Sequence, residues 1–71
     1  MTASYTWIGA VERLRNSLED EIETIGRYVK RRKQAEQLGH YGLAVEFDDL
    51  IRDETSRRDE LQLVLKRWNS G

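Results

Sequence analysis

The chain has 71 residues, and 35% of them are charged. Its 12 Lys and Arg residues nearly balance its 13 Asp and Glu residues, and a formal net charge of -1 gives no general attraction for nucleic acid or an anionic membrane. Because the chain has no cysteine, it has neither a disulfide framework nor a thiolate metal cage. A chain this short buries only about 60% of its unfolded surface, so we expect oligomerisation to supply further stability.

The hydropathy pattern argues against a membrane protein. Uninterrupted apolar runs reach only two or three residues, whereas a transmembrane helix needs roughly 20. The first ten residues lack the basic start and apolar core of a signal peptide. We therefore expect a cytoplasmic protein whose partners include no nucleic acid and no membrane.

Helical periodicity runs through most of the chain. There is no proline, and the glycines Gly39 and Gly42 mark the one plausible interior break, where a helix can be capped and the chain reversed. On both sides of this break, apolar residues recur at steps of three and four. They are Ile8, Val11, Leu14, Leu18, Ile22, Ile25 and Val29 before it, and Leu43, Phe47, Leu50, Ile51, Leu61, Val64, Leu65 and Trp68 after it. The spacing predicts helices over about 6–38 and 43–68.

The predicted fold class is all-α. A short connection makes the two helices antiparallel neighbours, so residues 1–71 form a single helical-hairpin domain. A lone hairpin leaves half of each apolar stripe facing water. A twofold homodimer covers both stripes by forming a four-helix bundle, with Trp7 and Trp68 placed at the open end of the hairpin to close the bundle or anchor the dimer.

Two glutamates interrupt the apolar pattern. Glu54 lies in the middle of the second stripe with Arg57 and Arg58 on either side, while Glu21 lies toward the edge of the first stripe near Tyr28. An ionised carboxylate in a core has to be paired, hydrogen-bonded or bound to a cation. We expect these five side chains to form a buried polar network.

The stretches QAEQLGHY (34–41) and LIRDETSRRDEL (50–61) resemble a helix pair of the ferritin-like superfamily, particularly bacterioferritins and rubrerythrins. In that superfamily one helix carries a Glu a turn or two before a Tyr, which Glu21 and Tyr28 match. The next helix carries Glu-x-x-His after an acidic residue, which Asp53 and Glu54 match in part. The resemblance implies a ferritin-like four-helix bundle with a di-metal site built on Glu21 and Glu54.

This sequence departs from the ferritin-like pattern at Arg57, which stands where the histidine is required. Arginine stays protonated and offers no lone pair to a metal, and the sole histidine, His40, lies in the predicted turn. In one explanation, a dimer gathers two Glu21 and two Glu54 around iron or manganese. In the other, Arg57 or Arg58 replaces the metal charge and no cofactor is needed. We prefer the second, because a guanidinium beside the site repels cations.

Other enzyme templates lack their parts. The chain has no cysteine nucleophile, no glycine-rich phosphate loop and no His-Glu-x-x-His motif. The sequence therefore favours a non-enzymatic structural or protein-interaction module that pairs with itself. The alternative is an iron- or manganese-binding protein, which as an enzyme would be a ferroxidase-type oxidoreductase.

Overall fold

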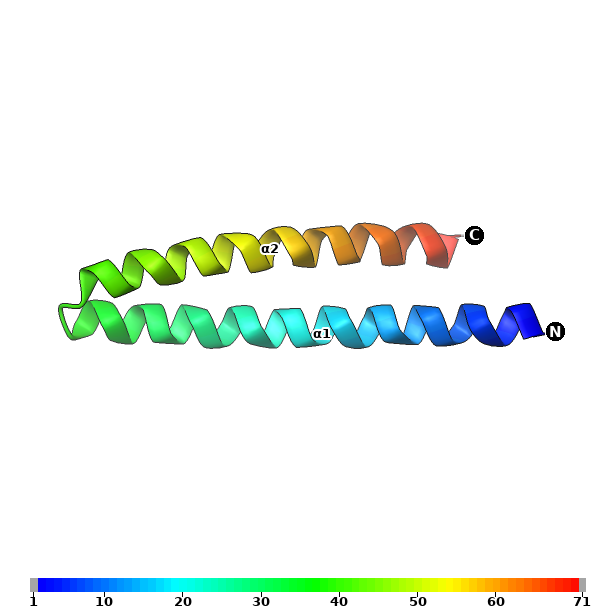
Figure 1. Cartoon of the computed structure of the whole chain (residues 1–71), viewed down its shortest axis with the longest axis horizontal. Helices are drawn as coiled ribbons and strands as arrows, with labels where there is room; N and C mark the ends of the chain where they lie inside the picture. The colour runs from blue at the N-terminus through cyan, green and yellow to red at the C-terminus, as the bar shows by residue number, and fades with distance from the viewer. Residues whose placement is uncertain (1, 71) are drawn as a thin grey trace.

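The chain forms two long antiparallel helices joined by a tight turn. The structure is a computed structural model that describes the backbone of residues 2–70 and the side chains of residues 7–68. Helix α1 covers Thr2–Gln37 and helix α2 covers Tyr41–Ser70, side by side along their length (Figure 1). The described residues contain no strand. The predicted all-α hairpin is confirmed, and both helices begin earlier than predicted because no proline precedes either stripe.

The hairpin is a rod and not a globule. Its principal extents are 58, 14 and 13 Å, and its radius of gyration is 16.4 Å. A compact domain of this length has a radius of gyration of about 11 Å. The two ends of the chain lie at the same end of the rod (Figure 1). Each helix is therefore covered by a neighbour on one side only.

The turn is a Schellman motif centred on Gly39. The N–H of His40 donates to the carbonyl of Ala35 at 2.8 Å, and the N–H of Gly39 donates to the carbonyl of Glu36 at 3.0 Å. This pair of bonds satisfies carbonyls that the end of α1 would otherwise leave without donors. Gly39 has a φ of 77°, the left-handed conformation that favours glycine. The predicted helix break at this glycine is confirmed.

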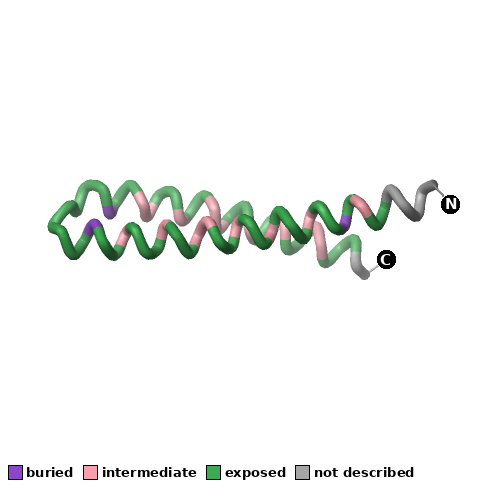
Figure 2. The backbone as a smooth tube through the Cα atoms, turned by 90° about the horizontal axis from the view of Figure 1, so that it is seen from below, coloured by how far each residue is buried: buried purple, intermediate pink, exposed green. Residues whose placement is uncertain are grey.

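Contact between the helices follows a seven-residue repeat. A subset of the covered positions recurs at steps of three and four, which is the spacing of a coiled coil, and these positions line the inner sides of both helices (Figure 2). In α1 they are Val11, Leu14, Leu18, Glu21, Ile25, Tyr28, Arg32 and Ala35, and in α2 they are Ala44, Phe47, Ile51, Glu54, Arg58, Leu61 and Leu65. We call these the heptad positions.

Two aromatic pairs fix the axial alignment of the two helices, that is, which residues lie at the same height along the hairpin. The rings of Trp7 and Trp68 are 4.6 Å apart near the open end, and those of Tyr28 and Phe47 are 6.0 Å apart nearer the turn. Tilted pairs at these separations lie in the favourable range for aromatic contacts. Trp7 and Trp68 thus meet at the open end, as the sequence predicts.

Candidate functional site

The middle of the hairpin holds two carboxyl groups in heptad positions, Glu21 from α1 and Glu54 from α2. Both residues are half-buried, and only 14% of the Glu21 side chain is exposed. The Oε2 atom of Glu21 is buried and receives no hydrogen bond. Two ionised carboxylates are both acceptors, so a proton held on one of them is the donor that this pair lacks.

The surroundings of Glu21 favour that proton. The pKa of Glu21 is raised above its ordinary value of 4.5, first by the hydrogen bond with Glu54, then by burial and by the negative charge of Glu54. Arg57 acts in the opposite direction, while Asp20 adds to the increase. The folded protein therefore holds the proton of Glu21 to a higher pH than an exposed glutamate does.

The arginines of the predicted network lie in different places. Arg57 Nη1 is 3.9 Å from Glu21 Oε1, and 67% of the Arg57 side chain is exposed. An ion pair this long and this exposed contributes little. Arg58 occupies a heptad position, but its Nε and Nη2 atoms donate to Asp59 at 3.3 and 3.1 Å. The structure brings Glu21, Glu54 and Arg57 together, while Arg58 binds Asp59.

Tyr28 lies seven residues closer to the turn than Glu21, and its ring packs against Phe47. Tyr28 thus serves in aromatic packing, which is the commoner use of a tyrosine in a core. Of the five residues predicted to share a polar network, Tyr28 thus lies seven residues from Glu21 and has an aromatic partner.

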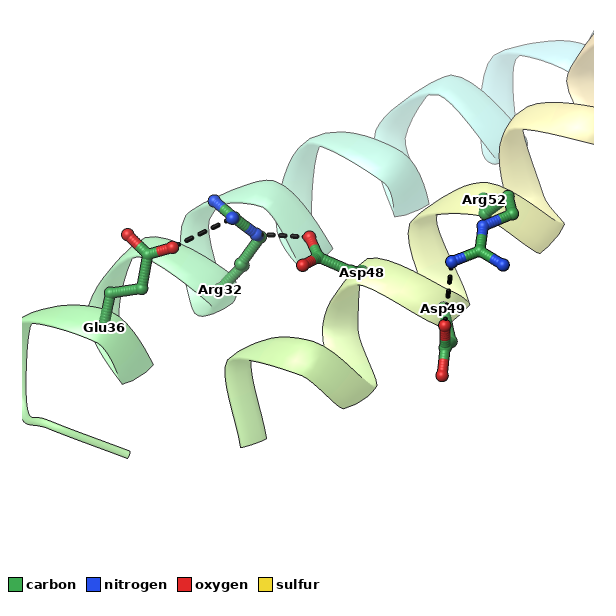
Figure 3. Close-up of polar contacts among 5 residues, drawn as sticks. All are labelled: Arg32, Glu36, Asp48, Asp49 and Arg52. Carbon is green, nitrogen blue, oxygen red and sulfur yellow. Dashed lines mark hydrogen bonds and ion pairs between the residues drawn. The ribbon is translucent and has the colours of Figure 1, made fainter. Parts of the chain in front are cut away.

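A polar cluster near the turn was not predicted from the sequence. Arg32 occupies a heptad position of α1, where its Nε donates to Asp48 of α2 and its Nη2 is 2.9 Å from Glu36 (Figure 3). The run of four basic residues from Lys30 to Lys33 hides this role, because only the heptad spacing singles out position 32. The cluster joins the two helices through a solvated ion pair, since 38% of the Arg32 side chain is exposed.

Many large apolar side chains remain exposed along the hairpin. Among the described residues, eleven large hydrophobic side chains are exposed, whereas the buried apolar residues are Val11, Ala35 and Ala44. Contiguous apolar patches on a protein surface are typical of interaction sites. Ile22 is 49% exposed and Leu50 is 41% exposed, although both belong to the predicted apolar stripes.

One face carries Leu50 and Arg57, and we call it the Leu50 face. Near the turn, Ala35 of α1 and Leu43 and Phe47 of α2 line one groove of about 330 Å³, together with Leu38 of the turn itself. Both helices therefore contribute to this side. Residues seven apart continue along the same side of a coiled coil. The face consists of Ala10, Ser17, Thr24 and Arg31 from α1, Leu38 from the turn, and Leu43, Leu50, Arg57 and Val64 from α2.

The opposite side, which we call the Ile22 face, carries the Arg32 cluster. Glu36 and Asp48 both contact Arg32 there (Figure 3). The positions that repeat with Glu36 along α1 are Ile8, Arg15, Ile22 and Val29, and those that repeat with Asp48 along α2 are Tyr41, Thr55 and Gln62. The two faces thus differ in charge.

The described residues contain no group of three or more side chains suited to hold a metal ion. Neither helix combines the length and apolar character needed to cross a bilayer within the described chain. No protein-family model, curated protein or solved structure matches this chain. The resemblance to the ferritin-like superfamily accordingly stays a prediction.

Proposed function

We propose that this chain is a structural or protein-interaction module that works as a homodimer, in which two hairpins form a four-helix bundle. The observation that carries the proposal is the excess of exposed surface. The chain exposes 5758 Å², whereas a compact monomer of this mass exposes about 4,600 Å². The excess of roughly 1,100 Å² exceeds the area of about 800 Å² that each partner buries in a standard interface. In this proposal the bundle is ferritin-like and its metal site is degenerate, with Arg57 in the place of a ligand.

Unfolding of a dimer that is stabilised by its interface depends on protein concentration. We expect a mass of two chains at micromolar concentration in sedimentation equilibrium, and a melting temperature that falls by several degrees over an about hundredfold dilution. A folded monomer at micromolar concentration, with a melting temperature that does not change on dilution, would contradict the proposal.

A second candidate function, binding of iron or manganese, is favoured by one observation. The Oε2 atom of Glu21 is buried and receives no hydrogen bond, and either a proton or a metal ion supplies what it lacks. Carboxylate oxygens from Glu21 and Glu54 of two chains are ligands that suit manganese or iron. Arg57 opposes this use, because its Nη1 lies 3.9 Å from Glu21 Oε1 and adds a fixed positive charge.

Replacing Arg57 with histidine tests this second candidate. Arg57→His adds a neutral imidazole one turn from Glu54 and removes the positive charge, so we expect ferrous or manganous ion to bind at least about tenfold more tightly than to the parent chain. The measurement is calorimetric titration of each ion into both proteins. Arg57→Leu is the matched control, since it removes the charge without adding a ligand. Equal, weak binding by all three chains would rule out the metal function and undercut the ferritin-like resemblance.

A further inference from the structure

We propose that a second copy of this chain covers the Leu50 face, with the turns of both copies at the same end of the bundle. This inference rests on the proposed homodimer and adds the surface and the orientation that the dimer uses. The face runs along a hairpin whose principal extents are 58 and 14 Å, and the area of one such side is on the order of the 800 Å² that each partner of a standard interface buries.

The charged groups distinguish the two faces. Covering the Ile22 face would desolvate the Arg32 cluster, whose Arg32 and Asp48 side chains are 38% and 44% exposed. Removing such ion pairs from water costs more than their attraction returns unless the geometry is excellent. The Leu50 face instead carries the exposed Arg57, beside the Glu21 carboxyl whose Oε2 atom has no donor. A second copy on this face brings a second Arg57 guanidinium to that carboxyl pair.

The sizes of the side chains favour turns at the same end. The aromatic pairs Trp7–Trp68 and Tyr28–Phe47 fix which residues of α1 and α2 lie at the same height along the rod. In this alignment Leu50 lies beside Thr24, and Val64 lies beside Ala10. When the twofold axis runs along the rod, α1 of one copy lies over α2 of the other at these same levels. Leu50 and Val64 of α2 then meet the smaller Thr24 and Ala10 of α1, and this alternation of large and small side chains packs well. Nearer the turn, Leu43 meets Arg31.

The opposite orientation lacks this complementarity. With the turns at opposite ends, each helix lies over its own symmetry mate, so that the row Leu43, Leu50 and Val64 meets itself.

Charges at the edge of the Leu50 face point to the same orientation. Three or four residues from the face positions, α1 carries Arg13, Asp20 and Arg27, while α2 carries Glu46, Asp53 and Glu60 at matching levels. With α1 over α2, Arg13 and Arg27 lie opposite Glu60 and Glu46 of the second copy, and only Asp20 meets a like charge. With α2 over α2, the row of Glu46, Asp53, Glu60 and Arg67 meets itself, and its carboxylates outnumber its one cation. Complementary charge selects orientation and partner.

Two glutamate substitutions of matched exposure test the surface. Leu50→Glu and Ile22→Glu each place a charge at a position that is exposed in the hairpin itself, at 41% and 49%. We expect Leu50→Glu to weaken the dimer at least about a hundredfold, whereas Ile22→Glu changes its dissociation constant by less than about threefold. Light scattering across a dilution series gives the constants, and circular dichroism verifies that both variants remain helical.

A single spin label tests the orientation. The chain has no cysteine, so His40→Cys gives one attachment point at the exposed turn. Turns at the same end give a label-to-label distance far below the 58 Å length of the rod, and turns at opposite ends give a distance close to it.

The outcomes separate the homodimer, the choice of face and the orientation. A monomeric parent chain overturns the proposed homodimer. A dimer that Ile22→Glu dissociates and Leu50→Glu leaves intact, or one that neither change affects, overturns only the choice of face. A long label distance in an intact dimer overturns only the orientation.

Discussion

Replacing Glu21 and Glu54 together with leucine is expected to raise the free energy of unfolding by about 2 kcal/mol. Proteins in which buried charged groups are replaced by apolar residues are often more stable by about 1 to 4 kcal/mol. Both glutamates occupy heptad positions, and the Oε2 atom of Glu21 is buried without a donor. For a chain of this size the melting temperature should rise by about 10 °C. Urea unfolding at fixed protein concentration measures the change.

The gain from this double replacement should grow with pH. Because the pKa of Glu21 is raised in the folded protein, the folded state binds more protons than the unfolded state just above the ordinary value of 4.5. The stability that Glu21 contributes is fully present below pH 4.5 and is lost as the pH rises through its folded pKa. The leucine variant lacks this loss, so its advantage is larger at pH 7 than at pH 4.

Replacing the exposed pair Glu19 and Glu23 with leucine is the matched control, for which we expect a change within about 0.5 kcal/mol. A double replacement at Glu21 and Glu54 that destabilises the protein at pH 7 would mean that the carboxyl pair has a stabilising partner, such as a bound cation.

Alanine at two glycines should change stability in opposite directions. Gly39→Ala forces a side chain into a backbone with φ of 77°, so we expect it to lower the free energy of unfolding by about 1 to 2 kcal/mol. Gly26→Ala lies within α1, and its new Cβ would meet no atom within 4 Å. It should raise the free energy of unfolding by about 1 kcal/mol, because alanine favours the helix.

Thermal and urea unfolding of these two variants at one protein concentration provides the measurement. The two variants should differ by about 2 to 3 kcal/mol. Loss of stability in both would indicate that Gly26 is in close contact with a second chain, because the hairpin itself leaves that space open.

The sequence alone determined the helices and the turn, because the information for both is local. Absence of proline and the recurrence of apolar residues at steps of three and four predict two long helices, and they are present as Thr2–Gln37 and Tyr41–Ser70. Gly39 predicts the reversal, since few other residues adopt a positive φ at the end of a helix. The interruption of both stripes by Glu21 and Glu54 was also visible, because a charged residue stands out in an apolar pattern.

Only the tertiary structure decided which side chains face the other helix. The apolar stripes are wider than the strip that a second helix covers, so Ile22 and Leu50 remain exposed while Arg32 and Arg58 occupy heptad positions. Steps of three and four fit several adjacent faces of one helix, and pairing against α2 selects one of them. The bond from Arg32 to Asp48 joins residues sixteen positions apart. It depends on which residues of the two helices lie at the same height along the hairpin. Aromatic pairs such as Tyr28 with Phe47 help to set this alignment, and no local sequence pattern contains it.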